Sequence, residues 1–576
     1  MRPVILLILV VLISCDQKKS AFSPATSDLK IGELVGRKPI IKHAVDTFKL
    51  DLTTDAIVYG YADQHDVDLV VKIFSPDNKE IGSFDGPARG RENFSFKTTL
   101  NGIHKLVITP FEEGAGEYSV VLTSADLLAK EPDKRIEQIV FGIFGDGEKT
   151  PGVSIAVQRD GKNIYTKGFG YADLEQNAKV TPNTIFHVAS VSKQFTCFAI
   201  AILADQGKLS IDDDIRKYIP EMHDFGTPIT IRHLAHHTSG LRDQWSLLNM
   251  AGWRYDDVIT TSHVLRIMAR QTELNFPPGN EYVYSNSGFT LMAEIVHRVT
   301  KEPFPDWCKK NIFDPIGMKN TIFFDDHERI VENRSNSYHQ ASNGYKKSVL
   351  NYANAGATSL FTTPEDLNLW ALNFEKVAVG NPNVMNIMND RFVLNNGDTI
   401  AYAFGQLIEK YKGLRTYSHS GGDAGFRSYL LRFPDQHFSV AIASNYAQIN
   451  TYDLATQIAD LYLKDELKPD NKPEENNQQN NSNKPPFDPA TIKLADYSGT
   501  YYSPELETTY WFELKNDTLL AHHQRHEDMK MIPTKADGFN GNIFGSVDFY
   551  RENGKVAGFR ASNGRVRNLK FIRQRD

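Results

Sequence analysis

A serine and a lysine one helical turn apart are the residues of this chain whose spacing most clearly permits chemistry. Ser190 and Lys193 stand in the tetrapeptide Ser-Val-Ser-Lys, ahead of apolar residues that recur at helical spacing up to Leu203. On a helix the two side chains share a face, and the helix start favours negative charge on the serine oxygen. A partly buried lysine amine can lose its proton and accept one from the hydroxyl. The pattern, a known S-x-x-K signature, predicts a serine nucleophile, with a helix N-cap at Ser190 as the alternative.

The same spacing occurs a second time, so the tetrapeptide alone is weak evidence. Ser27 and Lys30 stand in a polar stretch near the N-terminus, with no apolar helix behind them. We interpret this second copy as a coincidence.

A tyrosine and an asparagine form the second candidate group. Tyr284 and Asn286 follow a Pro-Pro-Gly turn and precede a predicted helix. A tyrosine hydroxyl beside a lysine can shuttle protons, and an asparagine amide can donate to a substrate carbonyl while it accepts from the lysine. The alternatives are a core tyrosine and a helix-capping asparagine. A second Tyr-x-Asn, at Tyr352 and Asn354, lacks both the turn and the helix.

The third candidate group lies before two predicted strands that a Pro-Asp turn joins. His419 is followed by Gly421 and Gly422. Glycines let a substrate backbone lie against a strand edge. Backbone N–H groups there can complete an oxyanion hole with the amide of Ser190. The alternative is a loop histidine beside a glycine-rich turn.

In this order, the three groups resemble the serine β-lactamase and penicillin-binding protein superfamily. The resemblance is greatest to its branch of class C β-lactamases, D-alanyl-D-alanine carboxypeptidases, D-aminopeptidases and esterases. It covers residues 135–465 and includes three further phrases, Ile229–Leu241, Ile312–Met318 and Gly356–Leu367. This resemblance implies an α/β (α+β) catalytic domain whose antiparallel sheet is flanked by helices.

The resemblance also implies a role for each candidate residue. Ser190 is similar to the nucleophile that forms an acyl-enzyme, and Lys193 to its proton partner. Tyr284 resembles the residue that acts with the lysine as general base and later directs the deacylating water. Asn286 is similar to the residue that positions the substrate amide, and Gly422 matches the strand position whose N–H serves the oxyanion hole.

One position departs from the pattern of many relatives. His419 stands where they carry the lysine of Lys-Thr-Gly, and a histidine is mostly neutral near pH 7. This weakens the case for a strong carboxylate site, although Arg427 follows closely and can replace the charge. We therefore expect a serine hydrolase that acts on an ester or a D-amino-acid amide or peptide, with Gly421 and Arg427 among the substrate-binding residues. The alternative is a non-hydrolytic penicillin-binding receptor or scaffold on the same fold.

The flanking regions predict two small β domains around the central one. Short alternating strands divided by Asp, Asn, Gly and Pro turns indicate an N-terminal β-sandwich, for which we favour the role of a spacer. A Pro- and Asn-rich stretch predicts a disordered linker, and the short strands after it a small antiparallel, lipocalin-like barrel with a filled core. The predicted ranges are 1–15 signal peptide, 16–35 tether, 36–125 sandwich, 131–465 catalytic domain, 466–487 linker and 488–576 barrel. The predicted helices of the catalytic domain begin near Glu131, Ser190, Ile231, Thr261, Ser287, Phe304, Pro364 and Tyr452.

The N-terminus predicts export. An apolar run follows Arg2 and ends in Leu-Ile-Ser-Cys, which resembles a bacterial lipobox with Cys15 as the acylated residue. We expect a lipoprotein in the cell envelope that faces the periplasm or the exterior and is held to the membrane by its lipid. The alternative is an ordinary signal peptide that contains a cysteine.

Composition limits the partners. With 576 residues, a net charge of −7 and 41% hydrophobic content, the chain suits a multi-domain protein with no electrostatic affinity for nucleic acid. We expect a small-molecule or peptide substrate, no cofactor and no metal. Two histidine clusters could in principle bind a metal, but no carboxylate or cysteine near them stands at ligand spacing. The clusters are His233, His236 and His237, and His522, His523 and His526. Nothing requires Cys197 and Cys308 to form a disulfide.

Overall fold

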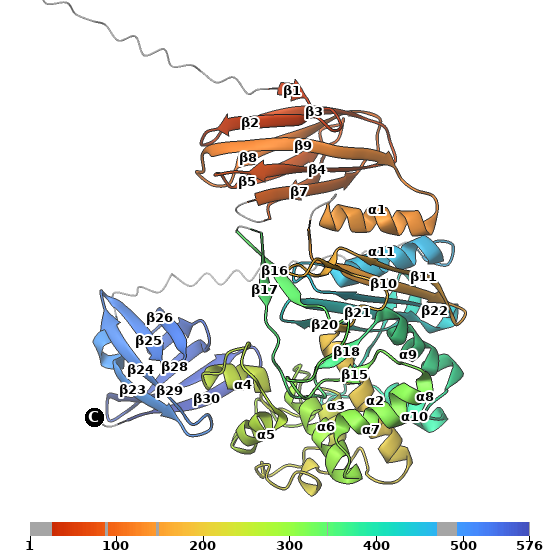
Figure 1. Cartoon of the computed structure of the whole chain (residues 1–576). Helices are drawn as coiled ribbons and strands as arrows, with labels where there is room; N and C mark the ends of the chain where they lie inside the picture. Colours follow the sequence, from red (N-terminus) through yellow and green to blue (C-terminus); the bar gives the residue numbers. More distant parts are fainter. Residues whose placement is uncertain (1–25, 87–89, 146–148, 343, 469–491, 575–576) are drawn as a thin grey trace, which may run out of the picture. The chain divides into compact units, whose positions relative to one another are not determined.

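The structure is a computed structural model that describes residues 26–86, 90–145, 149–342, 344–468 and 492–574 (Figure 1). The chain forms two compact units, Met1–Ala129 with Ser342–Gly344 and Lys130–Ala341 with Tyr345–Asp576. The predicted signal peptide, the lipid site Cys15 and most of the predicted linker lie outside the described residues. No helix in the described ranges has the length and hydropathy that a membrane span needs.

The first unit is a sandwich of two sheets, in agreement with the predicted fold class. One sheet has the order β1-β3-β8-β5-β6 and the other β2-β9-β4-β7. Phe48 and Val71 from the first sheet and Val58, Phe94 and Val120 from the second are buried in one core. The strands are β1 (Thr26–Asp28), β2 (Leu34–Ile40), β3 (Asp46–Leu52), β4 (Ala56–Gln64), β5 (Leu69–Phe74), β6 (Glu80–Phe84), β7 (Gly90–Lys97), β8 (Gly102–Pro110) and β9 (Gly116–Leu127).

The sandwich begins earlier than the sequence predicted. Residues 16–35 were expected to be a tether, but β1 pairs in parallel with β3 and Leu29 is buried in the core. The short polar segment carries no alternating apolar pattern, so only its pairing with β3 identifies it as a strand. Ser27, from the second copy of the Ser/Lys spacing, is exposed on β1 and lies in a different unit from Ser190.

A six-stranded antiparallel sheet forms the centre of the second unit. Its order is β11-β10-β22-β21-β20-β19. Its bounds are β10 (Val153–Arg159), β11 (Lys162–Phe169), β19 (Leu407–Tyr411), β20 (Leu414–Asp423), β21 (Phe426–Phe433) and β22 (Phe438–Ser444). Strand β22 is buried at every position, as expected for a strand covered on both faces.

Helices cover both faces of this sheet (Figure 1). α1 (Pro132–Phe144) and α11 (Thr451–Leu463) share one core with β10, β21 and β22, so the first and last helices of the domain lie on the same face. On the other face lie α9 (Pro364–Lys376) and α2 (Ser192–Asp205), within a second core. α2 is buried along almost its whole length, which explains why every residue from Cys197 to Leu203 is apolar.

The catalytic domain contains further helices and strands outside this sheet. The remaining helices are α3 (Ile231–Ala235), α4 (Gln244–Met250), α5 (Thr261–Ala269), α6 (Ser287–Thr300), α7 (Phe304–Cys308), α8 (Asp314–Ile316) and α10 (Pro382–Met388). The remaining strands are β12 (Tyr171–Asp173), β13 (Ala178–Lys179), β14 (Phe186–His187), β15 (Ile322–Phe323), β16 (Ser337–Ala341), β17 (Gly344–Ser348) and β18 (Leu360–Thr362). Cys197 in α2 and Cys308 in α7 are both buried free thiols.

The C-terminal part of the second unit is a closed antiparallel barrel, as predicted. Its strands are β23 (Gly499–Ser503), β24 (Thr508–Lys515), β25 (Thr518–His523), β26 (His526–Lys535), β27 (Gly538–Gly541), β28 (Gly545–Glu552), β29 (Lys555–Asn563) and β30 (Val566–Arg573). Aromatic rings fill its interior: Tyr501, Phe512 and Phe559 are buried and in mutual contact. The aromatic content that the sequence shows is thus packing inside the barrel.

A buried ion pair attaches the barrel to the catalytic domain. Arg242, in the loop before α4, donates to Glu505 across 2.8 Å, and both residues are buried. Glu505 also accepts from the backbone N–H and the hydroxyl of Thr272. Tyr510 donates its buried hydroxyl to the carbonyl of Met250 at the end of α4. Barrel and catalytic domain therefore share one packed interface.

Candidate active site

A tight turn positions the candidate nucleophile. Ser190 lies in the 3₁₀ turn η1 (Ala189–Val191), and α2 begins only at Ser192. Ala189 has a φ of 47°, and the hydroxyl of Ser192 donates to its carbonyl across 2.5 Å while accepting from the backbone N–H of Leu360. No side chain caps the start of α2, so the geometry does not support the alternative of an N-cap at Ser190. The turn leaves the Ser190 side chain partly exposed.

Lys193 is buried and makes three hydrogen bonds at the site. Its buried ammonium group donates to the Ser190 hydroxyl across 3.1 Å, to the side-chain oxygen of Asn286 across 2.9 Å and to the carbonyl of Ala357 across 2.7 Å. Burial lowers the pKa of Lys193 to about 7. A lysine with this pKa is partly neutral near pH 7 and can accept a proton from the serine that it contacts.

A carboxylate behind Asn286 fixes that side chain. Asp243 accepts from the backbone N–H of Asn286 across 2.7 Å and from its side-chain amide across 2.8 Å. The amide oxygen of Asn286 is thereby turned toward Lys193. Asp243 also caps α4 by accepting from the N–H of Trp245. Its negative charge raises the pKa of Lys193 and so opposes the effect of burial.

Tyr284 lies beside the serine and the lysine. The Lys193 nitrogen is 4.9 Å from the centroid of the Tyr284 ring. Burial raises the pKa of the Tyr284 hydroxyl, while a hydrogen bond with Ser190 acts in the opposite direction. The phenol therefore stays protonated at neutral pH and can serve as a proton donor as well as a relay.

His237 supports Tyr284 from behind. The sequence placed it with His233 and His236 on one helix face, but α3 ends at Ala235 and His237 has a φ of 59°. Its ring packs on Tyr284 with centroids 4.1 Å apart, and its Nδ1 accepts from the N–H of Ser285. The three histidines thus point to different partners, and the described part of the chain contains no group of three ligand-type side chains placed for a metal.

The C-terminal histidines are each engaged with neighbouring groups of the protein. His522 contacts the carboxylate of Asp528 across 2.6 Å, and His523 contacts the hydroxyl of Thr508 across 2.9 Å. His526 contacts the backbone carbonyl of Asn249, at the docking surface of the barrel. These contacts explain the histidines as packing and docking residues.

Strand β20 offers a backbone edge next to Ser190. β19 pairs with β20 only as far as Ser418, so Gly421 and Gly422 have a strand neighbour on one side alone, β21. A Cβ at Gly421 would overlap the carbonyl oxygen of Val188, which precedes the Ser190 turn. Glycine at 421 is therefore what lets the Ser190 turn approach the strand, and the exposed Gly422 follows directly.

Both polar side chains expected to bind substrate at this strand, His419 and Arg427, contact other groups of the protein. The His419 ring is buried and contacts the hydroxyl of Tyr402 across 2.9 Å, and burial lowers its pKa to about 3. His419 is therefore neutral. Arg427 donates to the carbonyls of Ala424 and Phe426 in its own hairpin. Neither residue presents an unpaired positive charge to a substrate.

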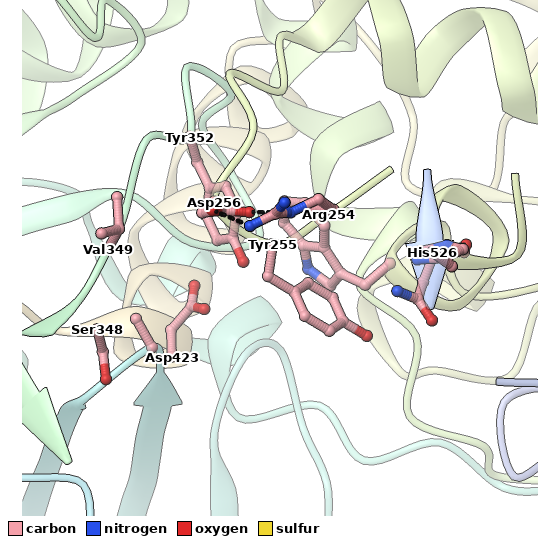
Figure 2. A pocket seen from close by; sticks show the side chains of 11 residues that line it. Arg254, Tyr255, Asp256, Ser348, Val349, Tyr352, Asp423 and His526 are labelled. Carbon is pink, nitrogen blue, oxygen red and sulfur yellow. Dashed lines mark hydrogen bonds and ion pairs between the residues drawn. The ribbon is translucent and has the colours of Figure 1, made fainter. Parts of the chain in front are cut away.

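A cavity of about 680 Å³ lies at the end of β20 (Figure 2). Asp423, directly after Gly422, is on its wall together with Trp245, Tyr255 and Tyr352. The rings of Trp245 and Tyr352 stack with centroids 4.4 Å apart. Tyr352, from the Tyr-x-Asn pair that the sequence set aside, is thus part of this wall. The cavity can hold an apolar or aromatic group that extends from the strand edge.

Known proteins share the fold and part of the sequence of this chain. The fold and the sequence place the chain in the β-lactamase and penicillin-binding protein superfamily. The chain belongs to the Beta-lactamase family, whose sequence profile matches residues 135–463, more than half of the chain. Among solved structures, the octameric penicillin-binding protein homologue from Pyrococcus abyssi has a TM-score of 0.52 at 21% identity over 76% of this chain and 99% of that chain. FmtA from Staphylococcus aureus has a TM-score of 0.50 at 24% identity over 60% of this chain and 92% of that chain. At these identities the likeness concerns the fold.

Two curated relatives have names that state an activity or a ligand. A D-aminopeptidase of Gluconobacter oxydans (strain 621H) is 27% identical over 296 residues, 51% of this chain and 56% of that protein. Penicillin-binding protein 4* of Bacillus subtilis (strain 168) is 26% identical over 355 residues, 57% of this chain and 75% of that protein. The chain spans little more than half the length of the D-aminopeptidase that it matches.

The sequence did not predict the positions of two residues of this site. Asp243 was not predicted to bind Asn286, and His237 was not predicted to pack on Tyr284. An aspartate before a short apolar stretch is a helix N-cap signal, and this signal could have located the start of α4. It could not have shown that the same carboxylate binds Asn286, because 43 residues separate the two in the chain.

Proposed function

We propose that this chain is a serine hydrolase that cleaves esters or D-amino-acid amides and peptides through an acyl-enzyme on Ser190. The observation that carries the proposal is the 3.1 Å contact between the Lys193 amine and the Ser190 hydroxyl, with the pKa of that amine near 7. The order of the motifs supports membership in the branch that contains class C β-lactamases, D-aminopeptidases and esterases.

Acylation begins with the neutral fraction of Lys193. The amine takes the hydroxyl proton as the Ser190 oxygen forms a bond to the substrate carbonyl carbon. Negative charge develops on the carbonyl oxygen, and the backbone N–H groups of Ser190 and Gly422 are the donors that we assign to it. Tyr284 gives its proton to the departing amine or alkoxide as the bond to the carbonyl breaks, and Lys193 returns a proton to Tyr284.

Deacylation repeats these steps with water as the nucleophile. Tyr284 and Lys193 take a proton from the water while its oxygen attacks the acyl carbon. The bond to Ser190 breaks, and the serine oxygen recovers its proton from Lys193. Asn286, held by Asp243, positions the substrate amide during both halves.

The proposed substrate class is supported by the names of relatives and by the lack of charge on His419. One relative is named a D-aminopeptidase, and His419 is neutral where a lysine would hold a fixed charge. The aromatic cavity beyond Gly422 suits the acyl half of an ester or of a D-residue amide. We expect weak hydrolysis of β-lactams at most.

Active-site labelling tests the proposal. A fluorophosphonate or a fluorescent penicillin should label the wild type, and Ser190→Ala should abolish labelling and turnover of short esters. Ser27→Ala, which removes the serine of the second Ser/Lys pair, is the matched control and should label fully. Labelling that persists in Ser190→Ala would remove Ser190 as the nucleophile. Stable labelling without turnover of any ester or D-amino-acid amide would favour the receptor or scaffold.

We further propose that the protein is exported and held to the bacterial cell envelope by a lipid on Cys15. The apolar run that ends in Leu-Ile-Ser-Cys supports this proposal. Metabolic labelling with a palmitate analogue should mark the wild type in the membrane fraction. Cys15→Ala should lose the label and should no longer be processed; a variant that stays lipidated would contradict the assignment.

A further inference from the structure

We propose, on the basis of the proposed function, that the C-terminal barrel supplies Arg565 to the active site, where it binds a carboxylate on the leaving-group half of the substrate. The residue comes from the turn between β29 and β30, 375 positions after Ser190 in the chain. The proposal rests on how this turn is held, on what its guanidinium group faces, and on the absence of a partner for that group.

The backbone of the turn is fixed to the catalytic domain next to the site. The carbonyl of Arg565 accepts from the N–H of Asp243 and, across 2.9 Å, from the side-chain amide of Asn275. The carbonyl of Arg567 accepts from the buried Arg242 guanidinium across 2.9 Å. Because Asp243 also holds Asn286, a series of three hydrogen bonds connects the turn to Lys193.

The side chain of Arg565 extends over the proton donor of the site. Its guanidinium carbon is 5.0 Å from the centroid of the Tyr284 ring, within the range of a cation–π contact. Its charge lowers the pKa of both Lys193 and Tyr284, which places it within electrostatic reach of the reacting groups. In the proposed reaction Tyr284 protonates the leaving group, so the guanidinium lies on the leaving-group side.

Arg565 differs from the other arginines by which the barrel reaches the catalytic domain. Arg525 pairs with Asp257, Arg560 with Glu273 and Arg567 with Glu281. In the part of the chain that the structure describes, the exposed Arg565 guanidinium has no carboxylate within ion-pair distance and donates no hydrogen bond. An arginine whose backbone is fixed by hydrogen bonds and whose guanidinium group has no ion-pair partner can bind an anion from solution.

The chemistry of the guanidinium group selects the ligand. Its planar fork donates two parallel hydrogen bonds to a carboxylate, and such charge-assisted bonds are about twice as strong as neutral ones. His419 is neutral and Arg427 is engaged with its own hairpin, so neither competes for this anion. The substrate that fits is a peptide or ester whose leaving group carries a free carboxylate, with the acyl group toward the aromatic cavity.

A pair of substrates that differ only in this charge provides the test. We compare kcat/KM for D-alanyl-D-alanine and for its C-terminal carboxamide, with p-nitrophenyl acetate as a reference for chemistry at Ser190. The wild type should prefer the free acid, and Arg565→Gln should reduce the acid-to-amide ratio by about 10- to 100-fold, the equivalent of one charge-assisted contact. Arg565→Lys should keep part of the preference. If the dipeptides bind without cleavage, the ratio of their inhibition constants against the ester replaces the ratio of kcat/KM.

Lys555→Gln is the matched control, because Lys555 begins β29 and is therefore about 25–30 Å along the strand from the turn. It should leave the ratio at the wild-type value. A wild type without preference for the acid, or an unchanged ratio in Arg565→Gln, would overturn the inference while esterase activity persists. A protein that turns over none of the three compounds would instead contradict the proposed function.

Discussion

At the scale of single residues, burial and nearby charges set the pKa of Lys193. Burial lowers the pKa of this amine, the Asp243 carboxylate raises it and the Arg565 guanidinium lowers it further. A base that acts at neutral pH must be neutral for part of the time, so this balance matters more than any single contact. The activity should therefore rise with pH through the pKa of Lys193, near 7.

Asp243→Asn tests this balance. The substitution removes a charge that raises the pKa of Lys193, so the acid limb of kcat/KM should move to lower pH. The plateau should also fall by roughly 10- to 100-fold, because the Asn286 amide loses a charge-assisted hydrogen bond of about 1.5–3 kcal/mol. The measurement is kcat/KM for a short ester across the neutral range. Asp435→Asn, which removes an exposed charge paired with Arg415, is the control and should not move the limb; a shift to higher pH in Asp243→Asn would contradict the assignment.

At the scale of elements, the site depends on the close approach of a turn and a strand. The turn η1 carries Ser190, and β20 carries the glycines of the proposed substrate edge. These two elements touch where Gly421 faces the carbonyl of Val188 and the hydroxyl of Ser428. The hydroxyl of Ser428 also donates to the Val188 carbonyl across 2.8 Å, so the same point is both packed and hydrogen-bonded.

Gly421→Ala should push the nucleophile turn away from β20. Its added Cβ has no room, and a displacement near 1 Å can reduce the rate by about 100-fold. Gly422→Ala adds the same atom one residue later, where the nearest neighbour is Arg427 at 3.7 Å, and should cost much less. The comparison of kcat/KM for the two variants checks the prediction, and equal losses would show that the approach at Gly421 does not position Ser190.

The predicted elements agree with the structure where the pattern was long and regular. The sequence predicted helices near Ser287 and Pro364, and the structure begins helices of 14 and 13 residues there. It did not predict α4, which has only seven residues. An isolated helix of this length is unstable in water, and contacts such as that between Tyr510 and Met250 hold it in place. Because α4 was not predicted, its N-cap residue Asp243 was missed as well.

At the scale of the whole molecule, the barrel and the catalytic domain are one structural unit. Their interface contains the buried pair of Arg242 and Glu505, while Glu507 nearby pairs with Arg266 and Arg270 at the surface. The Arg565 turn attaches beside Arg242. The stability of the interface and the geometry of the site are therefore linked through the same loop.

Glu505→Gln should lower the free energy of unfolding by about 3 kcal/mol, because it leaves the Arg242 charge buried without its main counter-charge. Glu507→Gln, two residues away, removes an exposed partner and should cost less than about 1 kcal/mol. Urea unfolding of the full chain measures both. Similar values for the two variants would show that the interface does not depend on the buried pair.

The sequence by itself predicted the order of domains, the class of the catalytic fold and the four candidate site residues Ser190, Lys193, Tyr284 and Asn286. Local spacing is sufficient to select the candidate residues, because each group is defined by neighbours within a few residues, whereas the catalytic fold was implied by the resemblance to a known superfamily. Only the tertiary structure decided that His419 is buried against Tyr402, that Asp243 fixes Asn286 and that Arg565 reaches Tyr284. Burial and long-range contacts set charge and orientation, and a linear pattern contains neither.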